Sequence, residues 1–316
     1  MTAKLISTLL VGVSALLSSV PATAQEVTLK VHHWASPRSN QHVGMLVPWC
    51  EKVMKESNNR IKCDVFHSMQ LGGSPPQLYD QARDGVADVI FTIPGYTAGR
   101  FPMVEAFELP FMMSSVEATS RALWDYTATV ARDEFKDTHL IAANMNGPCN
   151  IYTAKKAVTS QADLRGLKVR APSRQTGKML AMLGATPVGM PLPAIPEALS
   201  KGVIEGAVIP YQVVPSIKVN EIAKFGAETD PKFPALSTTV FTIAMNKAKY
   251  DSLPADLKKV IDANSGIEFS AMAGRVQEAD DGPGREKSKA AGMTINVIPA
   301  SELEKWKKAS GALDDE

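Results

Sequence analysis

The chain has 316 residues, with 34 basic and 33 acidic side chains, so its formal net charge is only +1. This balance argues against nucleic acid or an anionic membrane surface as the partner, since both favour a basic protein surface. With 45% hydrophobic residues, the chain is long and apolar enough to build two domains of ordinary size.

The first 24 residues have the pattern of a cleaved export signal. Lys4 supplies a positive charge, a short apolar stretch runs from Leu5 to Leu17, and Ala22-Thr23-Ala24 is a typical cleavage site. The stretch is too short to span a bilayer comfortably, and no later segment reaches about 18 uncharged apolar residues. We therefore predict a periplasmic protein, cleaved near Ala24, whose mature chain does not insert into the membrane. An N-terminal membrane anchor is the alternative.

Strands and helices alternate in the first third of the chain. Strands are predicted at residues 27–33, 61–67 and 87–92, where β-branched and apolar residues are concentrated. The first intervening helix has its apolar positions between Val43 and Met54, and Pro48 predicts a kink or a late start within it. Ser74 is suited to cap the second helix. This order predicts right-handed parallel units in a mostly parallel sheet.

A second block of this kind begins near residue 140. Strands are predicted at 140–144, 150–153, 167–171, 203–209 and 239–245, with helices at 173–183 and 197–201. A helix opening at Pro254 is expected to continue to about Asp280, just before Gly282-Pro283-Gly284. A strand at 294–299 and a helix from Ala300 complete an α/β pattern.

The three cysteines suggest one disulfide at most. Cys50 lies on a predicted helix and Cys63 on the strand that follows, and an exported chain meets oxidising conditions. The sequence leaves open whether these two residues pair. Cys149 would then be a lone, buried thiol. No Cys-x-x-Cys or Cys/His spacing indicates a metal site, and we expect neither a metal nor a cofactor.

Seven short motifs occur in a characteristic order. The most specific is Asp163–Pro172 (DLRGLKVRAP), followed by Leu183–Pro187 (LGATP) and Gly202–Gly206 (GVIEG). The supporting motifs are Gln70–Gly73 (QLGG), Gly85–Asp88 (GVAD), Phe107–Phe111 (FELPF) and Ser252–Pro254 (SLP). In this order the motifs resemble the solute-binding proteins of TRAP (tripartite ATP-independent periplasmic) transporters, the DctP-like family, over essentially the whole mature chain.

That resemblance implies a fold and a set of partners. It implies a two-domain periplasmic-binding-protein architecture with crossing strands, a long inter-domain helix and a ligand cleft between the domains. The first domain would comprise residues 25–147 with about 236–275, and the second residues 148–235 with about 276–316. The implied partners are a small organic acid anion and the small and large TRAP membrane subunits, and we expect a monomer.

Arg170 is the strongest candidate for contact with the ligand. In the family, the arginine of the motif that reads here as Lys-Val-Arg-Ala-Pro pairs with the ligand carboxylate. Arg170 also ends an otherwise apolar strand, and ligands of open α/β folds bind beyond the carboxyl ends of strands. A guanidinium can hold a carboxylate by two parallel charge-assisted hydrogen bonds. A structural ion pair is the alternative role.

Two positions differ from sialic-acid-binding members of the family. Asn150 stands where those members carry a second ligand-facing arginine, and Ile209 stands where they place an asparagine. Both differences make the pocket less polar. They favour a hydrophobic or aromatic monocarboxylate over a sugar acid.

Further candidates follow predicted strands, where a cleft between two α/β domains would lie. For each, core or loop packing is the alternative role. They are His33, Trp34, Gln70, Thr92, Tyr96, Asn146, Asn150, Met190, Leu192, Ile209 and Tyr211.

Nothing in the sequence forms a catalytic constellation. His32 and His33 are adjacent on a strand and so point to opposite faces, and there is no Gly-x-Ser-x-Gly motif. We therefore expect a receptor that delivers its ligand to a transporter without altering it. The alternatives are a ligand-sensing protein for a chemoreceptor or histidine kinase and, less favoured, a cleft hydrolase or transferase.

Overall fold

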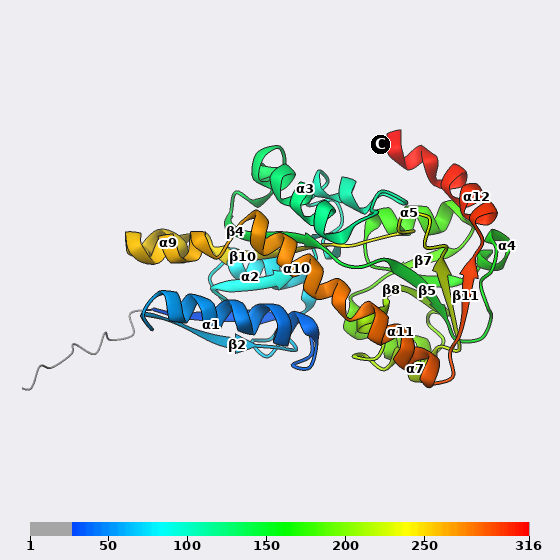
Figure 1. Ribbon diagram of the computed structural model, residues 1–316, viewed down its shortest axis with the longest axis horizontal. Helices are drawn as coiled ribbons and strands as arrows, with labels where there is room; N and C mark the ends of the chain where they lie inside the picture. Colours follow the sequence, from blue (N-terminus) through cyan, green and yellow to red (C-terminus); the bar gives the residue numbers. More distant parts are fainter. Residues whose placement is uncertain (1–26, 316) are drawn as a thin grey trace, which may run out of the picture.

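The structure, a computed structural model, describes residues 27–315. The expected export signal, residues 1–24, lies outside the described residues. The chain forms two sheets flanked by helices, which lie in two lobes side by side (Figure 1). We call the lobe around the five-stranded sheet lobe I and the lobe around the six-stranded sheet lobe II. The α/β architecture with two lobes agrees with the sequence prediction.

Lobe I contains a sheet with the strand order β2-β1-β3-β10-β4. Strands β2, β1 and β3 are parallel, as predicted, and β10 is antiparallel to both of its neighbours. The strands are β1 (Val27–His33), β2 (Ile61–Phe66), β3 (Val89–Thr92), β4 (Thr138–Met145) and β10 (Val240–Asn246). The helices that accompany them are α1 (Val47–Glu56), α2 (Leu78–Arg83), α3 (Val116–Thr129), α8 (Lys247–Ser252) and α9 (Ala255–Ala263).

Lobe II contains a sheet with the strand order β11-β9-β5-β8-β6-β7. Strand β5 is antiparallel to β8 and β9, and the other pairs are parallel. The strands are β5 (Cys149–Thr153), β6 (Lys168–Ala171), β7 (Thr186–Gly189), β8 (Gly206–Pro210), β9 (Phe225–Thr229) and β11 (Thr294–Ile298). The helices are α4 (Gln161–Leu164), α5 (Arg174–Met182), α6 (Ile195–Ser200), α7 (Val219–Ile222) and α12 (Ala300–Ser310).

Within residues 27–315 the chain crosses between the sheets three times, from β4 to β5, from β9 to β10, and through α10 (Ile267–Ala279) and α11 (Asp281–Ala290) to β11. The reversed strand of each sheet, β10 or β5, is the one that the chain enters directly from the other lobe. In Figure 1, α10 and α11 run from lobe I to lobe II as the orange helices. The crossing strands and the helical connection agree with the expected architecture, and the exact domain boundaries stay a prediction.

The prediction of one long helix from Pro254 to Asp280 is wrong, because two helices occupy this segment. Helix α9 ends at Ala263 and α10 begins at Ile267, because Gly266 between them has a φ of 94°, which a helix cannot continue through. The Gly282–Gly284 segment does not end a helix but lies in the first turn of α11, where a proline is tolerated. A Cβ on Gly284 would lie 2.3 Å from the Tyr211 carbonyl oxygen, so this glycine lets α11 pack closely on lobe II.

The predictions for the first two helices are confirmed at their starts. Helix α1 begins at Val47, next to Pro48, after a π-helical turn. Ser74 and Gln77 form a capping box at the entry to α2. The predicted apolar face of the first helix is wrong at its ends, because Val43 and Met54 are exposed.

Cys50 and Cys63 lie next to one another but form no disulfide in this structure. Both are free thiols, and a hydrogen bond joins them. That hydrogen bond, together with burial, raises the pKa of the Cys50 thiol. Cys149 is a buried free thiol. The pairing that the sequence left open is therefore not made here.

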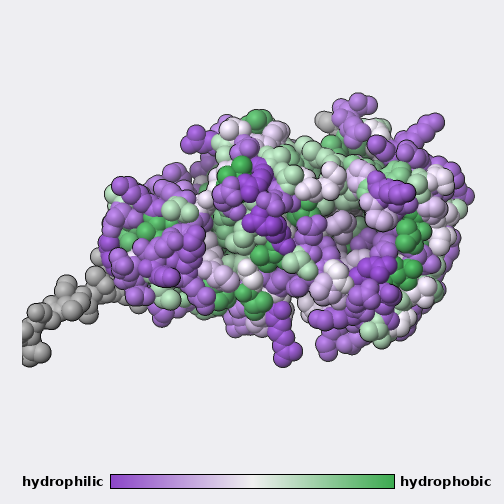
Figure 2. Space-filling view, in the orientation of Figure 1, coloured by the Kyte–Doolittle hydropathy of each residue, from purple (hydrophilic) through white to green (hydrophobic). Residues whose placement is uncertain are grey.

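The surface is mainly polar on the face shown in Figure 2, with a notch at the lower edge where the two lobes meet. Within residues 27–315, no helix is both long enough and apolar enough to cross a bilayer.

Candidate functional site

A small cavity lies where the two lobes meet. Lobe I contributes residues that follow β1 and β3 and residues at the start of β10, and lobe II contributes β6, β8 and the turn after β8. The free volume is about 20 Å³, which is room for about one water molecule. The cavity is lined by Trp34, Ile93, Tyr96, Asn146, Cys149, Arg170, Pro172, Leu192, Val208, Ile209, Pro210, Gln212, Val213, Thr239 and Phe241.

Arg170 is the charged residue of this cavity, and only 2% of its surface is exposed. Its Nε donates to the Met190 carbonyl at 2.9 Å, and its Nη1 donates to the Val208 carbonyl at 2.9 Å. A third interaction is a hydrogen bond with the Tyr96 side chain. The two carbonyl groups fix the plane of the guanidinium, while an arginine has five N–H groups to satisfy.

The positive charge of Arg170 is not neutralised within the described part of the chain. Burial lowers the pKa of Arg170, and the groups that partly oppose this effect are Tyr96 and Cys149 rather than a carboxylate. A buried charge without a counter-ion is costly, because water no longer solvates it. An anion that entered the cavity would be attracted strongly, since little water is present to screen the charge.

Aromatic rings form much of the remaining wall. Trp34 and Tyr96 meet edge to face with their centroids 6.4 Å apart, and Trp34 stacks on Phe91 at 6.0 Å. Phe91 in turn stacks on Phe241 at 5.3 Å. These contacts fix the rings that line the cavity. The site therefore combines one buried cation with flat apolar walls, an arrangement suited to an anion with an apolar body.

Contacts between the lobes surround the cavity. The Tyr96 hydroxyl of lobe I accepts a hydrogen bond from the Leu192 backbone N–H of lobe II at 3.1 Å. Arg174, at the start of α5, donates through Nε to the buried carboxylate of Glu105 at 2.7 Å. On another side Asn40 donates to Gln212 at 2.6 Å. The structure thus shows the lobes closed on one another.

Another buried ionisable group, Glu108, lies at this interface. One carboxylate oxygen accepts from the Val240 backbone N–H at 2.8 Å, and the side chain also contacts Ser173 of lobe II. Burial raises the pKa of Glu108 to about 7, against the opposing effect of these hydrogen bonds. Gly95 shares this tight region, because a Cβ there would lie 2.8 Å from the Ser173 Cβ.

The structure brings part of the predicted site together. These candidates line the cavity: Arg170, Trp34, Tyr96, Asn146, Leu192 and Ile209. Asn146 accepts from the Thr239 backbone N–H at 2.8 Å, which fixes the crossing between β4 and β5 beside the cavity.

Three lobe I candidates lie away from the cavity. His33 is buried and its Nε2 lies 3.0 Å from the His42 Nδ1; burial lowers the pKa of His33 to about 3. Thr92 is buried within β3. Gln70 is exposed and its side chain accepts from the His67 backbone N–H. None of the three lines the cavity around Arg170.

Three lobe II candidates also lie elsewhere. Met190 contributes its backbone carbonyl to Arg170, but the residue lines a neighbouring hollow and not the cavity. Asn150 and Tyr211 line a separate pocket beside α11, and the Tyr211 hydroxyl donates to Glu228 at 2.9 Å. In this closed structure none of these side chains reaches the cavity.

Sequence reasoning missed the residues that β10 contributes. Thr239 and Phe241 reach the cavity because β10 runs antiparallel to β3, which places the start of β10 beside the carboxyl end of β3. The rule that ligands lie beyond the carboxyl ends of strands does not find such residues. Gln212 and Val213, in the turn after β8, could have been found by that rule.

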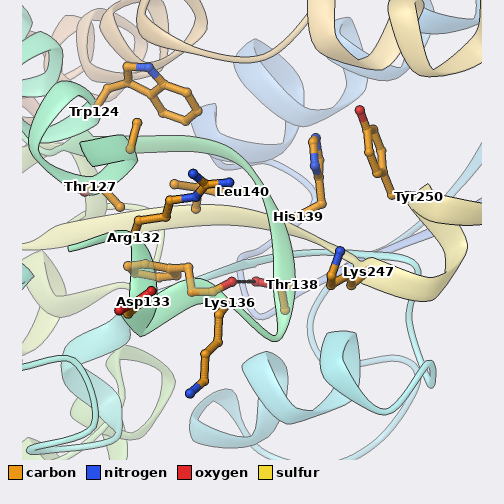
Figure 3. Close-up of a pocket in the computed structure, with 12 residues that line it drawn as sticks. Trp124, Thr127, Arg132, Asp133, Lys136, Thr138, His139, Leu140, Lys247 and Tyr250 are labelled. Atoms are coloured by element: carbon orange, nitrogen blue, oxygen red, sulfur yellow. Dashed lines mark hydrogen bonds between the residues drawn. The ribbon is translucent and has the colours of Figure 1, made fainter. Parts of the chain in front are cut away.

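A larger pocket, of about 340 Å³, lies entirely in lobe I (Figure 3). Trp124 of α3, Arg132, His139 of β4, and Lys247 and Tyr250 of α8 are among the residues that line it. The His139 and Tyr250 rings stack with centroids 3.5 Å apart. No residue of lobe II contributes, so closure of the lobes would not change this pocket.

The family described as bacterial extracellular solute-binding protein, family 7 (DctP), matches residues 31–316. The chain belongs to this family. The DctP proteins include the solute-binding receptors of TRAP transporters, which bind small organic acids and work with membrane subunits. The α/β lobes and the closed cavity described above are therefore those of a transport receptor.

Three relatives of the DctP receptor can be compared directly. A TRAP solute-binding protein of Rhodoferax ferrireducens, solved with copurified benzoate, is 55% identical, covers 90% of this chain and 89% of its own, and has a TM-score of 0.89. One from a marine metagenome, solved with 3-hydroxybenzoate, is 46% identical, covers 92% and 91%, and has a TM-score of 0.90. The C4-dicarboxylate-binding periplasmic protein of Rhodobacter capsulatus is 24% identical and covers 97% and 92%.

Proposed function

We propose that this DctP receptor captures an aromatic monocarboxylate, such as benzoate or a hydroxybenzoate, for a TRAP transporter. The observation that carries the proposal is the buried guanidinium of Arg170, which has no carboxylate partner among residues 27–315. It faces a cavity walled by Trp34, Tyr96 and Phe241. The guanidinium would hold the carboxylate through two hydrogen bonds, and the ring would lie against the aromatic walls.

The two solved relatives that carry benzoate and 3-hydroxybenzoate support this choice of ligand. The relative named for C4-dicarboxylates is more distant in sequence. A second carboxylate would need a second cation, and the residues that line this cavity include no lysine and no arginine besides Arg170. A monocarboxylate therefore fits the charge of the site better than a dicarboxylate.

Binding would proceed by closure of the two lobes. The closed cavity has room for about one water molecule, so a ring can enter only when the lobes are apart. Contacts with both lobes would then favour the closed form over the open form. The bound ring would hold the lobes slightly farther apart than they are here, and the Tyr96 contact with Arg170 would give way to the carboxylate.

We also propose how the receptor is delivered and how it acts. Residues 1–24 would direct export and be removed, leaving a monomer in the periplasm. The ligand would be released unaltered to the membrane subunits. Burial raises the pKa of the one thiol that lines the cavity, Cys149, to about 12, which makes it a poor nucleophile. The described residues that line the cavity include no carboxylate, histidine or lysine that could act as a base, and no metal cluster. Light scattering of the mature protein would test the monomer, and chromatography of the released ligand would test the lack of turnover.

The ligand assignment can be tested by calorimetry on protein that has been unfolded and refolded to remove copurified ligand. Benzoate should bind, and benzamide, which has the same ring without the charge, should bind at least about 100-fold more weakly. Succinate and a sialic acid should bind weakly as well. If benzamide matched benzoate, or if only succinate bound, the proposed function would be wrong.

A further inference from the structure

A second apolar space lies behind one wall of the ligand cavity. It is a groove of about 330 Å³ that both lobes line, with Met69 and Pro75 from lobe I and Pro193 and Ile217 from lobe II among its residues. The ligand cavity has only about 20 Å³ of free space. The closed receptor therefore has a tight compartment next to a roomy one.

The wall between the two spaces is a single layer of side chains. Trp34, Leu192 and Val213 line both the cavity and the groove, and all three are buried. Trp34 is fixed by its contacts with Phe91 and Tyr96. Leu192 and Val213 are aliphatic and form the part of the wall that can be shortened without removing an aromatic contact.

We propose that Leu192 and Val213 set the length of the aromatic acid that the receptor accepts. This inference rests on the proposed function, since it assumes that Arg170 fixes the carboxylate inside the cavity. With the carboxylate fixed, each methylene between it and the ring moves the ring outward. The cavity has so little free space that the lobes must already separate slightly to hold a benzoate ring. Each added methylene of an arylalkanoate must separate them further or strain the walls, which is costly in a close-packed interior.

The groove is the favoured direction for the extra length because most of its lining surface is apolar and no charged residue lines it. A different hollow, beyond Tyr96 and Pro172, also adjoins the cavity, but the charged Arg174 lines it and the Tyr96 hydroxyl is held by the Leu192 backbone N–H. A phenyl ring loses water more favourably in the groove than beside the charged side chain of Arg174. Shortening the wall would join cavity and groove into one elongated apolar site.

The test compares benzoate, phenylacetate, 3-phenylpropanoate and 4-phenylbutanoate by calorimetry on refolded, ligand-free protein. The unmodified receptor should bind 3-phenylpropanoate at least about tenfold more weakly than benzoate, because the longer acid overpacks the cavity. The double variant Leu192→Ala, Val213→Ala should change that ratio by at least about tenfold in favour of the longer acid. The backbone N–H of residue 192, which donates to Tyr96, is kept in this variant.

Ile217→Ala is the matched control, because Ile217 lines the groove but not the cavity. It should leave the ratio between the two acids within about twofold of the unmodified value. If the double variant does not fold by circular dichroism, Leu192→Val decides instead, with an expected change of about threefold from the one methylene removed.

The outcomes separate this inference from the proposed function. The inference alone is overturned if the receptor binds benzoate through Arg170 but the double variant keeps the relative affinities of the unmodified receptor for the four acids. Tight binding of 3-phenylpropanoate by the unmodified receptor also overturns it. A receptor that binds no aromatic acid at all overturns the proposed function.

Discussion

The cavity between the lobes and the pocket within lobe I are each lined by an arginine, and they differ in almost every property that governs anion binding. The cavity between the lobes is about 20 Å³, and its Arg170 is buried and held by two backbone carbonyls. The pocket within lobe I is about 340 Å³, and its Arg132 is exposed (Figure 3). Lys247 in the larger pocket already pairs with Asp251 at 3.1 Å.

If the ligand binds at Arg170, as we propose, neither the volume of a pocket nor its number of cations identifies the ligand site. Water screens an exposed cation, and an exposed ion pair contributes little, typically about 0–1 kcal/mol. A buried guanidinium is screened far less, so a single charge can dominate the affinity for an anion. Closure of the two lobes keeps water away from Arg170, whereas lobe I alone does not keep water away from Arg132.

The largest effect that would sharpen this comparison is expected for Arg170→Ala. Affinity for benzoate should fall at least about 100-fold, because the carboxylate would lose its charged partner in a site that is sheltered from bulk water. Arg170→Lys should also weaken binding, since a point charge cannot replace the planar fork. Calorimetry measures both, with the melting temperature as a control for folding. Near-normal affinity of Arg170→Ala for benzoate would show that the buried guanidinium does not dominate anion binding.

A second test concerns how much the burial of an ionisable side chain lowers the free energy of unfolding. The pKa of Glu108 is raised by burial to about 7. The unfolded chain therefore loses this proton at a lower pH than the folded protein, and the free energy of unfolding falls as pH rises from about 4.5 to about 7. Glu108→Gln keeps an acceptor for the Val240 N–H and removes the charge. Its stability advantage over the unmodified protein should grow by about 2 kcal/mol between pH 5 and pH 8.

Urea unfolding at the two pH values measures this difference for Glu108. The prediction requires that the difference in free energy of unfolding between Glu108→Gln and the unmodified protein increase with pH. A gap that is the same at pH 5 and pH 8 would show that Glu108 is ionised in the folded protein as readily as in the unfolded chain.

A smaller effect is expected at the contact between the lobes. In the closed form, Arg174→Ala would leave the carboxylate of Glu105 buried without its ionic partner. The closed form should become less favourable, and benzoate affinity should fall by about tenfold with faster dissociation. Stopped-flow release kinetics and calorimetry measure the two quantities, and Arg174→Lys should lose less. Unchanged dissociation would show that this ion pair does not stabilise closure.

The smallest effect is expected for Arg132→Ala in the lobe I pocket. Benzoate affinity should stay within about twofold and stability within about 0.5 kcal/mol, because Arg132 is exposed. Calorimetry and urea unfolding provide the check. A loss comparable to that of Arg170→Ala would mean that the larger pocket, or charge at a distance, governs binding.

The sequence predicts elements well where hydrophobic periodicity is strong. The parallel strands β1, β2 and β3 and the crossing strand β10 are such cases. Helix α3 was not predicted, since two of its buried positions, Ser120 and Thr127, are polar and dilute the apolar face. Strand β7 was not predicted either, because it is a mostly exposed edge strand that contains Pro187.

The candidate site was predictable only where it follows a local rule. Arg170 comes from a motif, and Trp34 and Tyr96 follow the carboxyl ends of β1 and β3. The same rule also selected His33. Neighbouring side chains of a strand point to opposite faces, and the His33 side chain points to the face on which it packs against His42. Phe241 depends on the antiparallel pairing of β10 with β3, a long-range contact that no local pattern records.

The most direct test of the central idea is a crystal structure of the receptor with benzoate. It should show the benzoate carboxylate held by two hydrogen bonds to the Arg170 guanidinium, with the ring between the lobes and in contact with Trp34 and Phe241. Benzoate bound in the lobe I pocket, or an Arg170 that keeps only its protein contacts while the carboxylate lies elsewhere, would contradict it.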